Sequence, residues 1–146
     1  MSDFAQTYQK YLALLNECIA TNKTAVFTAL EAARITSVQV DFDGEGDTGD
    51  ITCVAALIGE TSVDLPELRV QTVTAHYGAE TIHRENTESL TEAITHVCLD
   101  VLSAIADGWQ NNDGATGTFM LDVARRTIHL KLGQRFSDFA WSCHEL

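Results

Sequence analysis

Apolar side chains change their spacing along this chain, and that change limits the folds open to it more than any other feature. Near the N-terminus they recur every three or four positions, as along one side of an α-helix, at Phe4, Tyr8, Tyr11, Leu12, Leu15 and Ile19. From Val38 onward they alternate with polar residues, which is the spacing of a half-buried β-strand. A further helical stretch then interrupts the alternation. The pattern predicts an α+β fold.

Helical spacing marks three stretches. The first ends where Thr21-Asn22-Lys23-Thr24 breaks the pattern, and a shorter stretch follows over residues 26–33. We therefore expect two tandem helices within a helical N-terminal segment, residues 1–34. A third helix is expected over about residues 88–107, because Ser89 and Glu92 have the spacing of a capping box and a glycine follows the stretch. Asn86 or Thr87 is an alternative cap.

Strand spacing covers the rest of the chain. Residues 38–43 and 51–58 are expected to form a hairpin, residues 68–76 a third strand, and the last 38 residues a β-meander of three strands. The expected order is roughly ααβββαβββ. Because consecutive strands usually pair, this order predicts a mainly antiparallel sheet with the helices packed on one face. At 146 residues the chain fits a single domain, residues 1–146, with an α+β core over residues 36–146.

The charge balance limits the partners. Nine basic side chains against 21 acidic ones leave a formal net charge of −12. Binding of nucleic acid or of an anionic membrane depends on cationic side chains, so neither is expected as a direct partner. The field instead favours a basic protein surface. The alternative is that the acidity serves solubility alone.

The densest group of carboxylates lies within residues 41–50, at the end of the first expected strand and in the loop after it, and comprises Asp41, Asp43, Glu45, Asp47 and Asp50. Carboxylate and carbonyl oxygens are the ligands of calcium and magnesium. In a calcium-loop template, however, Thr52 stands where a closing glutamate is needed, and strands rather than helices flank the loop. A noncanonical divalent-metal site and a solvated hairpin turn both stay open.

A second polar loop follows the third expected helix. Asn111, Asn112 and Asp113 form a strong turn signal and could add oxygen ligands or hydrogen-bonding groups beside the first loop. Trp109 is a candidate anchor for a protein partner, although a tryptophan at a helix end also serves as a lid over the core. We count both loops as a candidate acidic binding surface.

Chemistry at the C-terminus would involve His144 or Glu145. Neighbouring strand residues face opposite ways, so these two side chains are not expected to act on one atom. The candidate metal ligands are Asp41, Asp43, Asp47, Asp113 and His144. The other histidines, His96 among them, show no recognisable pairing. Neither a nucleotide-binding nor a hydrolase motif occurs, so we name no catalytic residue and expect no cofactor apart from calcium or magnesium in the metal alternative.

The four cysteines are Cys18, Cys53, Cys98 and Cys143, without metal-ligand spacing. The N-terminus carries no secretory signal pattern. We therefore expect reduced thiols in a cytoplasmic protein, most of them as small core residues.

Two motifs carry a resemblance. Val40-Asp41-Phe42-Asp43-Gly44-Glu45-Gly46-Asp47 and Gly108-Trp109-Gln110-Asn111-Asn112-Asp113-Gly114 resemble a bacterial family of short acidic proteins that plasmids and integrated mobile elements often encode. The resemblance covers mainly residues 36–146, includes His144 and Glu145, and implies no known activity. Small acidic proteins of mobile elements often resemble antirestriction and anti-CRISPR inhibitors.

These observations lead to two main expected functions, and a structural accessory subunit stays open as a third. The first is a non-enzymatic interaction protein that binds a basic surface of a nucleic-acid-handling defence complex. The alternative is a divalent-metal-binding domain or metal-dependent hydrolase that uses residues 41–50. The oligomeric state does not follow from the sequence.

Overall fold

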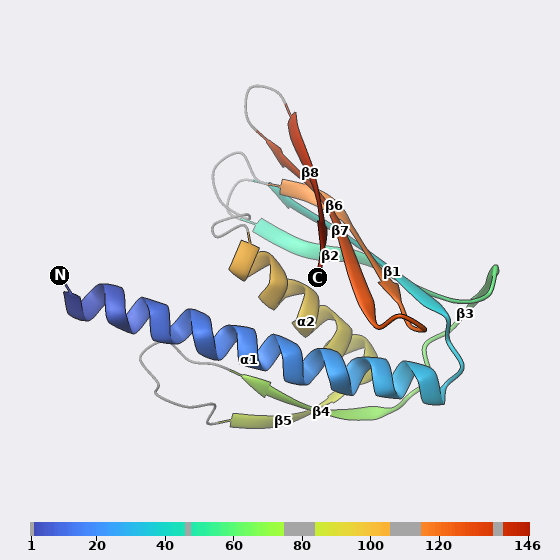
Figure 1. The fold of residues 1–146 in the computed structure, drawn as a ribbon. Helices are drawn as coiled ribbons and strands as arrows, with labels where there is room; N and C mark the ends of the chain where they lie inside the picture. Colours follow the sequence, from blue (N-terminus) through green and yellow to red (C-terminus); the bar gives the residue numbers. More distant parts are fainter. Residues whose placement is uncertain (1, 46–47, 75–83, 106–114, 136–138) are drawn as a thin grey trace. The chain divides into compact units, whose positions relative to one another are not determined.

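The computed structural model describes residues 2–45, 48–74, 84–105, 115–135 and 139–146 (Figure 1). These residues form two compact units, each assembled from two stretches of chain. The first unit comprises residues 1–29 and 67–105, and the second comprises residues 30–66 and 106–146. The expected α+β class with mainly antiparallel strands is confirmed. The expectation of one domain stays a prediction.

Helix α1 (Ser2–Ala32) is one continuous helix of 31 residues, so the prediction of two tandem helices is wrong. The polar stretch that suggested a break stays helical, because its side chains find partners without ending the helix. Thr24 Oγ1 donates to the carbonyl of Ala20 one turn earlier, at 3.1 Å. Asn22 is fully buried and bonds outside the helix.

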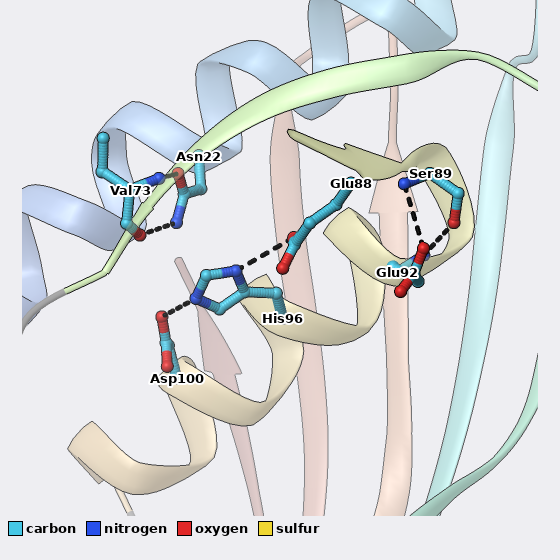
Figure 2. Close-up of polar contacts among 7 residues, drawn as sticks. All are labelled: Asn22, Val73, Glu88, Ser89, Glu92, His96 and Asp100. Carbon is cyan, nitrogen blue, oxygen red and sulfur yellow. Dashed lines mark hydrogen bonds and ion pairs between the residues drawn. The ribbon is translucent and has the colours of Figure 1, made fainter. Parts of the chain in front are cut away.

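The side-chain amide of Asn22 makes the two hydrogen bonds that a neighbouring strand would make to Val73. Its Oδ1 accepts from the Val73 N–H at 2.8 Å, and its Nδ2 donates to the Val73 carbonyl at 3.0 Å (Figure 2). Val73 belongs to β4 (Arg69–Thr74), so one side chain satisfies both backbone groups of a strand residue. A buried polar residue of this kind costs little, because each of its hydrogen-bonding groups is paired.

Strand β4 corresponds to the expected third strand, but it pairs with β5 (Arg84–Ser89) in a separate two-stranded sheet. Strand β5 was not expected, because its sequence Arg-Glu-Asn-Thr-Glu-Ser lacks apolar alternation. Ser89 ends β5 and caps α2 (Leu90–Ile105). The capping box is confirmed, since the Ser89 N–H donates to Glu92 Oε1 at 3.2 Å and the Glu92 N–H to Ser89 Oγ at 3.1 Å (Figure 2).

The second unit contains a six-stranded sheet with the order β3-β2-β1-β6-β7-β8 (Figure 1). Its strands are β1 (Ser37–Glu45), β2 (Thr48–Ile58), β3 (Thr61–Val63), β6 (Ala115–Asp122), β7 (Thr127–Arg135) and β8 (Phe139–Glu145). The expected hairpin and meander are confirmed, and β1 pairs with β6 to join them. Both strands of the hairpin extend into the acidic loop that was expected to form the turn, β1 as far as Glu45 and β2 from Thr48.

One face of this sheet is apolar and buried. It carries Val38, Val40, Phe42, Phe119, Leu121, Ile128, Leu130 and Leu132, each at most 2% exposed. Gly117 also matters to this face, because a Cβ there would meet the backbone carbonyl of Lys131 and would lie 2.9 Å from Phe42 Cζ. Strict alternation leaves the polar residues of the same strands on the opposite face.

Candidate functional site

The polar side of the six-stranded sheet brings together side chains that are far apart in the sequence. We call it the open face, and it comprises Asp41, Asp43, Thr116, Thr118, Met120, His129, Lys131, Cys143 and Glu145. All of them are half-buried or exposed. Residues paired across antiparallel strands share a face, so the register defines this set.

One row crosses the open face from strand to strand. It runs Cys53, Asp41, Thr118, Lys131 and Cys143, each residue paired with the next. Within this row, hydrogen bonds fix the orientation of the Asp41 carboxylate. Its Oδ1 accepts from Thr118 Oγ1 at 2.8 Å and from Gln39 Nε2 at 3.3 Å. Asp43 is exposed, and together with Asp41 it lines a shallow depression that also includes Thr52, Thr116 and Lys131.

The other predicted site residues divide into three groups. The backbones of Glu45 and Asp50 lie in β1 and β2, where Asp50 pairs with Asp43. His144 lies in β8. The remaining predicted residues, Asp47, Trp109, Asn111, Asn112 and Asp113, lie outside the described residues.

The described residues do not assemble the predicted metal ligands. Asp41 and Cys143 share the open face, so His144, next along β8, lies on the opposite face. Within the described parts of the chain, no group of three His, Cys, Asp or Glu side chains could hold a metal ion. The loop site therefore stays a prediction that depends on residues beyond the described ranges.

His144 contacts a potential nucleophile. Its Nε2 lies 3.1 Å from Ser142 Oγ, and Ser142 is exposed. A serine–histidine pair becomes a catalytic device when a third group orients the imidazole and donors await the oxyanion. The contacts of the described residues include no carboxylate on His144. The pair on its own is a surface hydrogen bond.

The first unit holds a histidine whose pairing was not expected. His96 Nδ1 lies 3.2 Å from Glu88 Oε2, and Nε2 lies 3.2 Å from Asp100 Oδ2 (Figure 2). The prediction that His96 lacks a partner is therefore wrong. The bond to Asp100 is the main cause that raises the pKa of His96 to about 9, against the opposing effect of burial. The imidazole is a cation that links β5 to α2, and both its nitrogens are occupied.

A family model described as a family of unknown function, DUF6878, matches residues 18–146. The chain belongs to the DUF6878 family. No curated protein and no solved structure matches the chain. The expectation of a family without known activity is thereby confirmed, and the match begins within α1 rather than at residue 36.

The cysteines of this DUF6878 chain divide evenly. Cys18 and Cys98 are buried, and burial raises the pKa of both thiols. Cys53 and Cys143 are exposed at the two ends of the row on the open face, so the expectation of mostly buried cysteines holds for only half of them. A thiol with a raised pKa is a poor nucleophile, which leaves the two exposed cysteines as the reactive pair.

The sequence of this DUF6878 chain did not predict that Thr118, Met120, Lys131 and His129 belong to the same surface. Their alternation with buried residues was visible, but the pairing of β1 with β6 was not. For His96 one signal was available, because Asp100 follows it by one helical turn. No helix among the described residues is long and apolar enough to cross a membrane.

Proposed function

We propose that this DUF6878 protein is a non-enzymatic interaction protein that binds a basic protein surface through its open face. The observation that carries the proposal is the combination of a net charge of −12 with exposed carboxylates on a regular sheet. Asp43 and Glu145 are exposed, and Thr118 holds Asp41 in a defined orientation. A carboxylate that is already oriented loses less conformational entropy when a cation binds it.

The open face also contains a cation. Lys131 lies in the same row as Asp41, with Thr118 between them. A purely basic patch would meet Lys131 as a like charge, and such juxtapositions oppose binding. The best partner therefore presents several cations around a neutral or acidic position. This mixed pattern favours a specific protein partner over a featureless cationic polymer.

The finer identity of the partner rests on analogy. A compact acidic scaffold can occupy lysine and arginine surfaces that otherwise hold nucleic acid. We therefore propose a nucleic-acid-handling defence complex in the cytoplasm as the target, and mobile elements as carriers of the gene. The support for this step is the resemblance to short acidic proteins of mobile elements, which is a family-level association.

The contacts of the described residues supply no argument for an enzyme. His96 is held between two carboxylates, and the ring of His144 contacts the hydroxyl of Ser142. The metal-dependent alternative needs Asp47 or Asp113 to complete a site, because the described ligands alone form none.

The test compares two variants with the same change in charge. Asp43→Asn with Glu145→Gln neutralises the open face, and Glu60→Gln with Asp64→Asn neutralises exposed carboxylates in and after the β2–β3 turn. Tagged forms of the native protein and of both variants are used to capture partners from a lysate of the bacterium that makes this protein, at about 0.1 M and about 0.5 M salt. We expect one set of basic proteins to be lost at high salt and with the open-face variant, and retained by the control variant.

The same variants are then scored for restriction of phage and plasmids in cells. Equal capture by both variants, or capture that salt does not weaken, would contradict a charge-based open face. Unchanged restriction with the native protein would contradict the defence target and leave the binding surface in place.

A further inference from the structure

The two edges of the six-stranded sheet are built differently. At one edge β3 has only three residues, and it pairs with β2 over Ala56–Ile58. The register between β1 and β2 also shifts between Asp41 and Phe42, which marks a bulge beside that edge. Short edge strands and bulges are common ways in which proteins prevent unwanted strand pairing.

The other edge lacks these protections. Strand β8 has seven residues, and its register with β7 runs without a shift. Its sequence Phe-Ala-Trp-Ser-Cys-His-Glu contains neither proline nor lysine, the residues that most often defend an edge. Ser142, Cys143 and Glu145 are exposed, and no described strand lies beyond β8.

The backbone groups that face outward can be assigned from the register. Leu146 exchanges both hydrogen bonds with Ile128, at 2.8 Å and 3.4 Å. Hydrogen-bonded and non-hydrogen-bonded pairs alternate along an antiparallel ladder. His144 is therefore hydrogen-bonded to Leu130, whereas Cys143 and Glu145 direct their N–H and C=O groups away from β7.

We propose that β8 is a docking edge on which an extended, cationic segment of the partner adds as a seventh strand. The inference rests on the proposed function and specifies how the basic partner is held. Main-chain hydrogen bonds to Cys143 and Glu145 supply the pairing, as in other cases of strand addition. A second copy of this chain would bring another net charge of −12 to the edge, so a cationic segment is the favoured occupant.

The neighbours of β8 determine which side chains the added strand should carry. A residue opposite Glu145 lies within reach of its carboxylate, so lysine or arginine suits that position. A residue opposite Cys143 continues the row that contains Lys131, so a neutral side chain suits that position. The docking segment should therefore alternate cationic and neutral residues on the side of the open face.

The first experiment uses the native protein and a synthetic probe. The probe is a peptide of about ten residues that alternates lysine–valine and threonine–valine pairs, so that lysine and threonine alternate on one side of the strand. Its control is the same peptide with N-methyl groups on its four central residues, which keep the charge and block main-chain pairing along both edges. Calorimetric titration is expected to show binding that is at least about tenfold weaker for the methylated peptide.

The second experiment changes the edge itself. Cys143→Pro removes one outward N–H and leaves the hydrogen bonds to β7 in place, because proline is tolerated on edge strands where its nitrogen faces solvent. Cys143→Val changes the same side chain and keeps the N–H. We expect about a tenfold loss of peptide affinity for the proline variant and less than about a twofold change for the valine variant. Circular dichroism and thermal melting check that the proline variant is folded.

Several outcomes would overturn the docking edge. These are equal affinities for the methylated and unmethylated peptides, equal affinities of the two Cys143 variants, or no binding of the peptide. Dimerisation of the native chain that Cys143→Pro abolishes, without peptide binding, would assign the edge to a second copy. In each case the charge-dependent capture by the open face can persist, so failure of the docking edge is distinguishable from failure of the proposed function.

Discussion

The imidazole of His96 shows how much of the structure depends on single residues. It lies between Glu88, at the end of β5, and Asp100, one turn further along α2 (Figure 2). Its side chain is 15% exposed, so solvent screens these ion pairs only in part. Two carboxylates around one imidazole repel each other unless the ring is protonated. The cation is therefore a structural link between the strand and the helix.

This link predicts a pH dependence of stability. The pKa of His96 is raised to about 9 in the folded protein, from 6.5. The stabilisation is therefore fully present below pH 6.5 and is lost as the pH rises through about 9. Its upper limit is about 3 kcal/mol. Urea unfolding between pH 6 and pH 10 should show this decline for the native protein. In the His96→Gln variant the decline should be absent, and an unchanged decline would assign it to other groups.

Thr72 is a residue whose replacement should stabilise the protein. Its side chain is fully buried in β4, and its hydroxyl has no hydrogen-bond partner among the described residues. A buried hydroxyl without a partner is destabilising, so Thr72→Val should raise the free energy of unfolding by about 1 kcal/mol. Thr118→Val is the control, since it removes a hydroxyl that donates to Asp41 and should lower the same quantity. Equal effects of the two substitutions in urea unfolding would contradict the assignment.

At the scale of elements, α1 is continuous because one of its polar residues serves a neighbouring strand. An asparagine is unfavourable within a helix by itself. Here its amide pairs with both backbone groups of Val73, as an additional strand would. The small sheet of β4 and β5 thus has one position of its edge closed by a helix side chain.

Replacement of this amide should separate helix propensity from protein stability. Asn22→Ala improves the intrinsic helix propensity but leaves the N–H and C=O of the half-buried Val73 without these partners. We expect a loss of about 2–4 kcal/mol in urea unfolding, and faster hydrogen exchange at the Val73 amide. Thr24→Ala is the control, because Thr24 is exposed and its hydroxyl donates to the carbonyl of Ala20 within the same helix. A loss as large for Thr24→Ala would contradict the role of Asn22.

The same elements show what sequence patterns can predict. Alternating apolar residues identified β1, β6 and β7, and the Ser89–Glu92 spacing identified the start of α2, because these signals are local. Asn22 was interpreted as a helix break, since its partner lies 51 residues away. Strand β5 depends on its pairing with β4 rather than on its own apolar content. For the site, Asp41 and Asp43 were identified, but Thr118 lies 77 residues from Asp41 and needed the sheet topology.

At the scale of the whole molecule, the main feature is the net charge of −12. Like charges repel one another within a folded chain of 146 residues, and counterions reduce that repulsion. Any salt should therefore stabilise the protein to some extent. A divalent cation therefore counts as a bound ligand only if it stabilises the protein more than sodium chloride of the same ionic strength does.

This distinction tests the metal-binding alternative. A site occupied at 100 times its dissociation constant would add about 2.7 kcal/mol to the free energy of unfolding. We expect melting temperatures in about 5 mM calcium or magnesium chloride to equal those in sodium chloride of matched ionic strength, and to be unchanged by EDTA at that ionic strength. A rise of several degrees with either divalent cation alone would favour the alternative, and Asp43→Asn would then identify the loop as its location.

The exposed thiols of Cys53 and Cys143, at the two ends of the row, allow a distance across the sheet to be measured. The two thiols lie on strands separated by four strand spacings, or about 19 Å along the hydrogen-bonding direction. Cys18 and Cys98 are buried and have raised pKa values, so a maleimide label should react with the exposed pair first. A pair of spin labels at these positions would measure the width of the sheet in solution. The label on Cys143 would lose mobility when another strand settles beside it.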